Sequence, residues 1–329
     1  MIRLIKMELY RLFHAVSTYV MFAVAVGLGI FMVFALKMDL EVMEREQSAF
    51  GAGAGAETGT PAESFASGFM DGWASEAEEA QAEGSAQNGM VSVTVNAGTE
   101  NEEGFEFGIS SSADESWLSG ELDAGELLIS EVQSSMLVLL VAIFVPLFVN
   151  AEQKKGYIKN IAGQIPKKEM LALSKMPAVA VQILLLFVVF CIAHASASAI
   201  FFRDRLVCHT FGTTLGALGV QYLIHTAWGC VLALLTMATR STAFAMTTGI
   251  LLASGIVELL MIYVNRAVHA LIPSAGQLDI RHYTLTYATN AMSMESTVRQ
   301  IGGFLVLAAV YIAVSSVLAG IVYHKRDVR

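Results

Sequence analysis

Charged side chains are scarce in this chain of 329 residues. They occupy 15% of its positions, whereas a soluble globular domain carries about 25%. Hydrophobic residues, in contrast, make up 55% of the sequence. This composition excludes an ordinary soluble domain and is typical of a chain that crosses a membrane several times.

Cysteine is also rare. The three cysteines, Cys191, Cys208 and Cys230, do not have the spacing of a metal site. None of them lies in the long polar segment at 38–131. A disulfide framework is therefore excluded for that segment.

A phosphate-binding loop is missing too. The glycine-rich run at 51–60 is not followed by Gly-Lys-Ser/Thr. The Leu-Ser-Gly-Glu sequence at 118–121 is faintly similar to the ATP-binding signature of transport ATPases, and without a phosphate loop we interpret it as a coincidence. We expect the chain not to be an enzyme and to hold no cofactor or metal itself.

Long apolar runs are what the sequence has in abundance. A transmembrane helix needs about 20 apolar residues. The first run lacks a small-residue cleavage site, so it is interpreted as an anchor and not as a removed signal peptide. Pro146 is expected to kink the second. We predict an all-α polytopic membrane protein with six transmembrane helices, at 15–36, 133–151, 177–201, 214–238, 242–265 and 300–323.

Basic residues near the ends of these runs predict the orientation. By the positive-inside rule, the segments that carry them lie in the cytoplasm. Both termini, including the tail at 324–329, are then cytoplasmic in a bacterial-type plasma membrane, and 38–131 and 266–299 lie outside. Residues 1–14 are expected to form an amphipathic helix on the inner surface of the lipid bilayer. Besides the 152–176 connection, the segments assigned to the cytoplasm carry Arg3, Lys6, Arg11, Arg240, Lys325, Arg326 and Arg329.

The outer segment at 38–131 is strongly acidic. It holds 21 acidic residues and one basic residue, Arg45, for a net charge of −20, whereas the rest of the chain has a net charge of +11. Alternation of apolar and polar residues over 91–95 and 105–109 predicts a β-hairpin, with helices before and after it. We predict a small α+β domain that packs on a second copy of the chain, because its own apolar content is thin.

The connection at 152–176 between the second and third predicted spans holds six lysines against two acidic residues. Ile158, Ile161 and Ile165 follow one another at helical spacing. Such an amphipathic helix can dock in a groove of a soluble partner or rest on lipid headgroups. We interpret it as a cytoplasmic coupling helix that receives force from a separate motor protein.

Polar side chains are few inside the predicted spans and therefore informative. Glu258 is the only acidic residue there, and His194, Gln221 and His225 are expected near its depth. This cluster is either a substrate-facing or proton-sensitive site, or a structural hydrogen bond between helices.

Small residues such as Gly27, Gly29 and Gly249 permit close helix packing, within the chain or across a dimer.

The connection at 152–176 also carries a family resemblance. The family pattern is an acid, then Gly-Thr-x-Lys, then a Pro-Ser-Arg-like step and a Lys at the next span. Tyr157 replaces the Thr, and Lys167 with Lys168 replaces Ser-Arg. With these matches and its six-span plan, the chain resembles permease subunits of ABC-2-type (type V) exporters. The matching residues are Glu152, Gly156, Lys159, Pro166, Lys168 and Lys175.

The resemblance implies a half-transporter. Two copies of the chain would form the path, and two separately encoded ATP-binding subunits, which hold ATP and Mg, would drive it. No nucleic acid is expected among the partners. The coupling contact would be made by Glu152, Lys155, Gly156, Ile158, Lys159, Ile161, Ile165, Pro166 and Lys168.

Members of this family move peptides, antibiotics, lipid-linked glycans or polysaccharides. The acidic outer segment would concentrate a cationic amphipathic peptide, such as a toxin, bacteriocin or antimicrobial peptide. Two other classes stay open. One is a secondary transporter or channel that works without a motor, and the other is a membrane sensor whose acidic outer domain binds a ligand.

Overall fold

The computed structural model of the chain describes residues 2–51, 93–94, 106–107, 117, 121–154, 169–209, 211–254, 256–271, 280–294 and 296–325. The chain divides into two units. The larger unit joins Met1–Val33 to Leu122–Arg329, and the smaller one is Phe34–Glu121.

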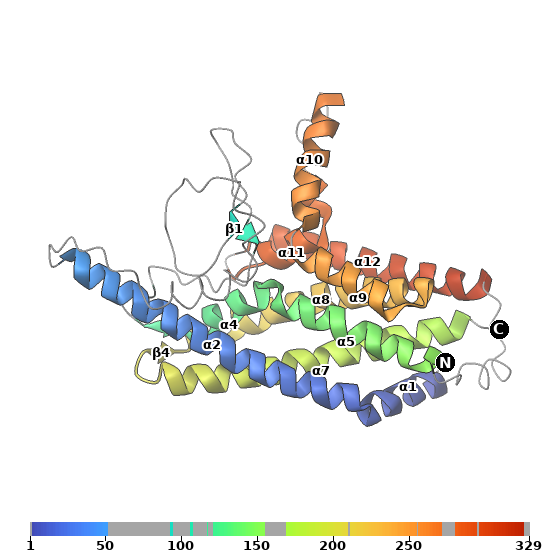
Figure 1. Cartoon of the computed structure of the whole chain (residues 1–329), viewed down its shortest axis with the longest axis horizontal. Helices are drawn as coiled ribbons and strands as arrows, with labels where there is room; N and C mark the ends of the chain where they lie inside the picture. The colour runs from blue at the N-terminus through green and yellow to red at the C-terminus, as the bar shows by residue number, and fades with distance from the viewer. Residues whose placement is uncertain are drawn as a thin grey trace, which may run out of the picture. The chain divides into compact units, whose positions relative to one another are not determined.

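The larger unit is a bundle of helices (Figure 1). Helix α8 lies at its centre, because it contacts α4, α5, α7, α9, α11 and α12. The helices of this unit are α1 (Ile2–His14), the first part of α2 (Val16–Gly51), α4 (Ala124–Gln133), α5 (Ser135–Lys154), α7 (Glu169–Phe201), α8 (Phe211–Thr239), α9 (Thr242–Ala253), α10 (Ile256–Leu271), η3 (Ile280–Tyr283), α11 (Leu285–Ala291) and α12 (Val298–Lys325).

Four described helices are long and apolar enough to cross a membrane: Val16–Arg45, Glu169–Phe201, Phe211–Thr239 and Val298–Lys325. A fifth span results if α4 and α5, which meet at a bend of 53°, count as one. Several of these helices expose rows of apolar side chains, which in a bilayer would face lipid tails. The chain is thus an all-α, multi-pass membrane protein. The exposed row on α12 consists of Val306, Val310, Val314, Val317 and Ile321.

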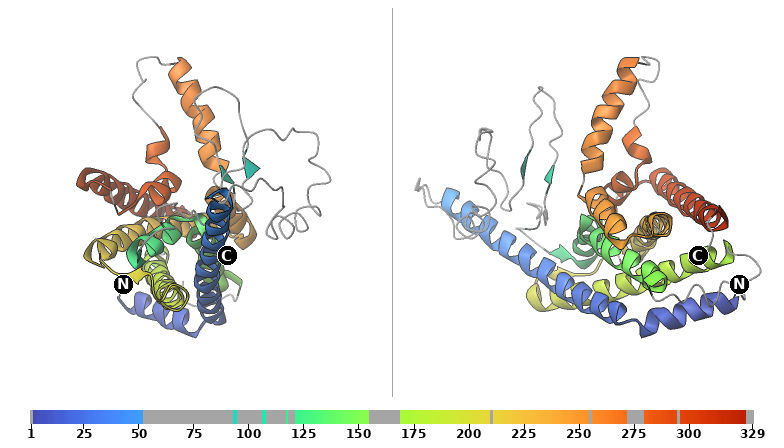
Figure 2. Two further views of the ribbon diagram at one scale, coloured as in Figure 1. Left: turned by 90° about the vertical axis from the view of Figure 1, so that its left-hand side faces the viewer. Right: turned by 45° about the vertical axis from the view of Figure 1, so that its right-hand side comes forward.

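The predicted fifth span at 242–265 is not one helix. Helix α9 ends at Ala253, Ser254 is its C-cap, and α10 begins at Ile256. Figures 1 and 2 show α10 leaving the bundle at a steep angle. With 12 residues, α9 is about 18 Å long, too short to cross the hydrocarbon core of a bilayer alone. The count of six spans is therefore not confirmed.

The second predicted span also differs from expectation. The bend of 53° lies between α4 and α5, where Ser134 is the C-cap of α4, whereas Pro146 lies inside α5, which continues to Lys154. Near the start of α4, Asp123 accepts hydrogen bonds from the N–H groups of Gly125 (2.7 Å) and His209 (3.3 Å). Strand β3 (Leu122–Asp123) pairs in parallel with β4 (Leu206–Val207) at the same place. These contacts join the start of α4 to the loop between α7 and α8.

Small residues let the helices pack closely within the chain. A Cβ added at Gly249 would lie 2.8 Å from Ala142 Cβ and 2.8 Å from Leu232 Cδ2, so α9 fits against α5 and α8 only with glycine there. A Cβ at Gly29 would lie 3.2 Å from Ala193 Cβ, which places α2 against α7. A Cβ at Gly27 would meet nothing within 4 Å. Gly29 and Gly249 thus serve packing inside one chain.

The smaller unit includes the second part of α2, where Lys37 Nζ lies 3.6 Å from Glu41 Oε1. It also includes β1 (Val93–Thr94), which pairs antiparallel with β2 (Glu106–Phe107) so that Val93 faces Phe107. This pairing falls inside the predicted hairpin at 91–109. Most of the predicted α+β domain lies outside the described residues, so the domain stays a prediction.

Candidate functional site

The described structure reaches the predicted coupling segment from both sides. Helix α5 ends at Lys154, and α7 begins at Glu169. The residues between them lie outside the described part of the chain, so their predicted motor contact stays a prediction. This holds for Lys155, Gly156, Ile158, Lys159, Ile161, Ile165, Pro166 and Lys168. Glu152 lies in the last turn of α5.

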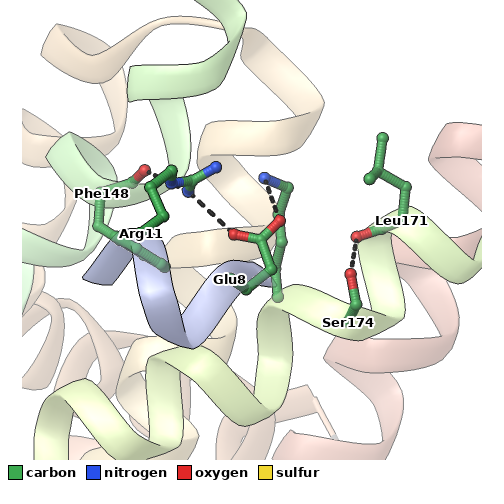
Figure 3. A network of polar contacts seen from close by, with 6 residues as sticks. Glu8, Arg11, Phe148, Leu171 and Ser174 are labelled. Atoms are coloured by element: carbon green, nitrogen blue, oxygen red, sulfur yellow. Dashed lines mark hydrogen bonds and ion pairs between the residues drawn. The ribbon is translucent and has the colours of Figure 1, made fainter. Parts of the chain in front are cut away.

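A buried ion network lies where α1 meets these two helices (Figure 3). The carboxylate of Glu8 on α1 is shared by two cations. Its Oε2 lies 3.1 Å from Arg11 Nη2, and its Oε1 lies 3.6 Å from Lys175 Nζ on α7. The side chains of Glu8 and Lys175 are both 0% exposed. One buried carboxylate thus binds α1 to the second turn of α7.

Arg11 extends the network to α5. Its Nη2 donates a hydrogen bond of 3.1 Å to the carbonyl oxygen of Phe148. Its guanidinium carbon lies 4.7 Å from the centre of the Phe148 ring, in cation–π geometry. Helix α1 therefore contacts both helices that flank the predicted coupling segment.

The sequence of α1 explains which face it buries. Glu8 and Leu12 are one turn apart, so they lie on one face of the helix, and both are fully buried. Tyr10 and Phe13 on the other side are exposed. The predicted amphipathic helix exists, and the structure packs its buried face on α7. Sequence reasoning missed Glu8, although it is the only acidic residue before Asp39, a signal that it has a specific partner.

Because the charges of Glu8 and Lys175 are buried, the stability of the folded chain depends on their pairing. A buried charge costs several kcal/mol of free energy unless a partner compensates it, on the order of what a whole buried side chain contributes.

A second ion pair at this end joins His324 Nδ1 to Glu169 Oε1 at 2.6 Å, between the last turn of α12 and the first turn of α7. Its side chains are 73% and 42% exposed, so this pair contributes little to stability. Together the contacts place the described ends of the chain at the same end of the bundle.

The predicted intramembrane cluster is only partly described. His194 on α7 is buried, and its Nδ1 lies 3.5 Å from Ser198 Oγ, one turn away. His225 on α8 is buried against the Phe187 ring, and its Nδ1 donates to the carbonyl of Gln221 at 2.8 Å, because a carbonyl can only accept. Each histidine thus has its hydrogen bond within its own helix.

Gln221 forms hydrogen bonds between two helices. Its amide donates hydrogen bonds to the carbonyls of Thr289 (2.9 Å) and Met292 (3.2 Å) at the end of α11. Gln133 on α4 also donates to the Met292 carbonyl, and Trp228 Nε1 donates to Thr289 Oγ1 at 3.2 Å. Gln221 therefore fixes the short helix α11 against α8. Sequence reasoning missed these partners, because a backbone carbonyl at the end of a short helix leaves no signal in the sequence.

Glu258 lies in α10, and its side chain is outside the described part. Among the described residues, no hydrogen bond joins His194 to Gln221 or His225. The predicted contact of these residues with Glu258 stays a prediction. In the same part of the chain, no group of three or more His, Cys, Asp or Glu side chains is placed to hold a metal ion.

The chain matches no protein-family model, and no curated protein matches its sequence. The class that the fold defines is a multi-pass helical membrane protein. A more specific function has to be argued from the residues of this chain and their contacts.

Proposed function

We propose that the chain is the permease subunit of an ATP-driven exporter of the ABC-2 type. Two copies form the path across the membrane, and two separate ATP-binding subunits drive it. The observation that carries this proposal is the buried network of Glu8, Arg11 and Lys175, which ties α1 to both helices that flank the segment at 155–168.

A motor outside the membrane can move the spans only through a firmly held contact. If the segment at 155–168 were attached to two independent helices, a push would move one of them and leave the other. The network opposes this, because it links α5 and α7 through α1. Since both charges of the Glu8–Lys175 pair are buried, salt in the cytoplasm screens it little.

The acidic outer segment supports a cationic amphipathic peptide as the substrate. Its net charge of −20 faces the side where an exported peptide would emerge. Such a field raises the local concentration of a cationic ligand, and it acts over about 8 Å at physiological ionic strength. The peptide is thereby held near the exit of the path.

Uptake by inside-out vesicles tests this function. The vesicles are prepared from the native membranes and from a strain that lacks the chain, and the probe is a labelled amphipathic peptide of lysine and leucine. We expect ATP-dependent uptake only when the chain is present. Uptake should fall when Glu76, Glu78, Glu79 and Glu83 are replaced by Gln, because the outer segment then attracts cations less strongly.

The matched control is a peptide of the same length with glutamate in place of lysine, which should be taken up poorly. Uptake that proceeds without ATP would favour the motor-independent transporter. Equal uptake of both peptides would contradict the assignment of a cationic substrate.

A further inference from the structure

We infer that Ser134 is a hinge in the span formed by α4 and α5, and that the carbonyl oxygen of Met292 holds this hinge at its observed angle. Gln133, the last residue of α4, and Gln221 on α8 both donate to this oxygen. The position of α4 is thereby coupled to the docking of α11 on α8. The hinge goes beyond the proposed function and does not depend on it, since it concerns how one span bends.

The break between α4 and α5 lies at one residue. Helix α4 ends at Gln133, and α5 begins at Ser135. The φ angle of Ser134, −57°, is helical, whereas its ψ angle of 146° is extended. Rotation about this single bond would join the two helices into one and remove the bend of 53°.

The sequence around Ser134 permits the bend but does not impose it. Sharp kinks usually occur at proline or at glycine and serine pairs, and no proline or glycine lies between Glu126 and Val145. Ser134 and Ser135 form a serine pair, and Ser134 Oγ donates to the carbonyl of Glu131 at 2.6 Å. This local bond favours the break, but serine is also tolerated within a helix. The angle therefore depends on contacts with other helices.

The contact with α11 sets this angle. Leu127 and Val132 on α4 are fully buried, but apolar packing has no preferred direction and allows a range of angles. The bond from Gln133 to Met292 is directional, and it acts on the residue next to the hinge. Met292 is the C-cap of α11, and its carbonyl has two lone pairs, so it also accepts from Gln221 at 3.2 Å. One oxygen atom thus joins α4, α8 and α11.

The docked position of α11 is only weakly favoured. Gln221, His225 and Trp228 share one face of α8, because they follow one another at helical spacing. Gln221 and Trp228 bind α11 through Thr289. Within the described part of the chain, Gln221 Oε1 and His225 Nε2 are buried without a hydrogen-bond partner. Such an acceptor costs about as much free energy as one hydrogen bond contributes, so these two offset part of the bonds that hold α11.

Straightening would displace the start of the span. Glu126 lies eight residues before Ser134, about 12 Å along α4. Removing the bend of 53° at Ser134 moves this residue by about 11 Å. Glu126 on α4 and Leu215 on α8 are both exposed. The distance between spin labels at these two positions therefore reports the movement.

The test measures this distance by double electron–electron resonance in the full chain, with the three native cysteines replaced by alanine. The chain with Gln133 intact should show one main distance. Gln133→Leu should raise the population of a second distance about fivefold, the usual effect of losing one hydrogen bond. Hydrogen exchange of the α11 amides should become about fivefold faster in the same variant, because Met292 loses its donor from α4. Ser130→Ala is the matched control, since its hydroxyl donates to Leu127 within α4, and it should change neither measurement.

A second variant, Ser135→Pro, tests the hinge itself. Proline is favoured at the first residue of a helix, and the extended conformation of Ser134 suits the residue before it. A continuous helix cannot hold proline at this place. The second distance should therefore disappear in Gln133→Leu/Ser135→Pro. If Gln133→Leu does not reach the membrane, Ser134→Ala replaces it, because alanine removes the bond to Glu131 and favours a continuous helix, and the second distance should again increase.

Three results would overturn the inference. Unchanged distances in Gln133→Leu and in Ser134→Ala would show that packing alone fixes the bend. A second distance that persists with Ser135→Pro would place the movement elsewhere in the chain. Unchanged exchange of α11 in Gln133→Leu would show that Met292 does not couple α11 to α4. None of these measurements uses ATP or peptide uptake, so each of these results leaves the proposed function intact.

Discussion

Replacing Glu8 with leucine should lower the free energy of unfolding by about 3–5 kcal/mol, the usual result of removing one partner from a buried ion pair. The ammonium of Lys175 would stay fully buried without the carboxylate that compensates it. Lys175→Met should cost a similar amount, because the buried Glu8 carboxylate then loses its ion pair with Lys175 and keeps the one with Arg11. Stability is measured by reversible unfolding of the purified chain in mixed micelles.

The double variant Glu8→Leu/Lys175→Met should be within about 1 kcal/mol of wild type, since apolar residues that replace a buried ion pair are often neutral or stabilising. Arg11 is 24% exposed and keeps its hydrogen bond to Phe148, so it tolerates the loss of Glu8 better than Lys175 does. Glu41→Gln should change stability by less than about 0.5 kcal/mol, because its pair is exposed. A double variant as unstable as the sum of the single variants would show that the pair does not act as a unit.

Replacing Ile158 and Ile161 by aspartate should abolish transport while the chain remains folded in the membrane. Each isoleucine, if buried in a groove of the ATP-binding subunit, contributes about 1.5–3 kcal/mol to the contact. Losing both would weaken association by a factor of at least about 100, since 1.4 kcal/mol corresponds to tenfold. Co-purification of the ATP-binding subunit and peptide uptake by vesicles measure the two effects.

The conservative variant Ile158→Leu/Ile161→Leu is the control, because it keeps the apolar stripe and should retain transport. A chain with both aspartates that still transports and still binds its ATP-binding subunit would show that the segment at 155–168 is not the motor contact.

The long apolar helices were the part of the fold that could be predicted best from the sequence. The third, fourth and sixth predicted spans lie within α7, α8 and α12, because each has about 20 apolar residues in succession. Helix α7 starts before its apolar run, at Glu169, since polar residues can continue a helix outside the lipid. The break after Ala253 could not be predicted, because hydropathy does not report whether two apolar stretches form one helix.

For the candidate sites, too, burial could be predicted from the sequence and the hydrogen-bond partners could not. Burial of His194, Gln221 and His225 was implied by their places in apolar runs. Their partners were not, since the carbonyls of Thr289 and Met292 meet Gln221 only after α11 has folded back on α8. Likewise, Glu8 and Lys175 are far apart in the sequence, and only the packing of α1 on α7 reveals their pairing.

The most direct test of the central claim is the composition of the complex that contains this chain. The tagged full chain is purified from its native membranes in mild detergent and analysed by native mass spectrometry together with ATP hydrolysis. We predict two copies of the chain with two copies of an ATP-binding subunit, and ATP hydrolysis by that complex. Recovery of the chain without any ATP-binding subunit, from membranes that still take up the lysine–leucine peptide, would contradict the account.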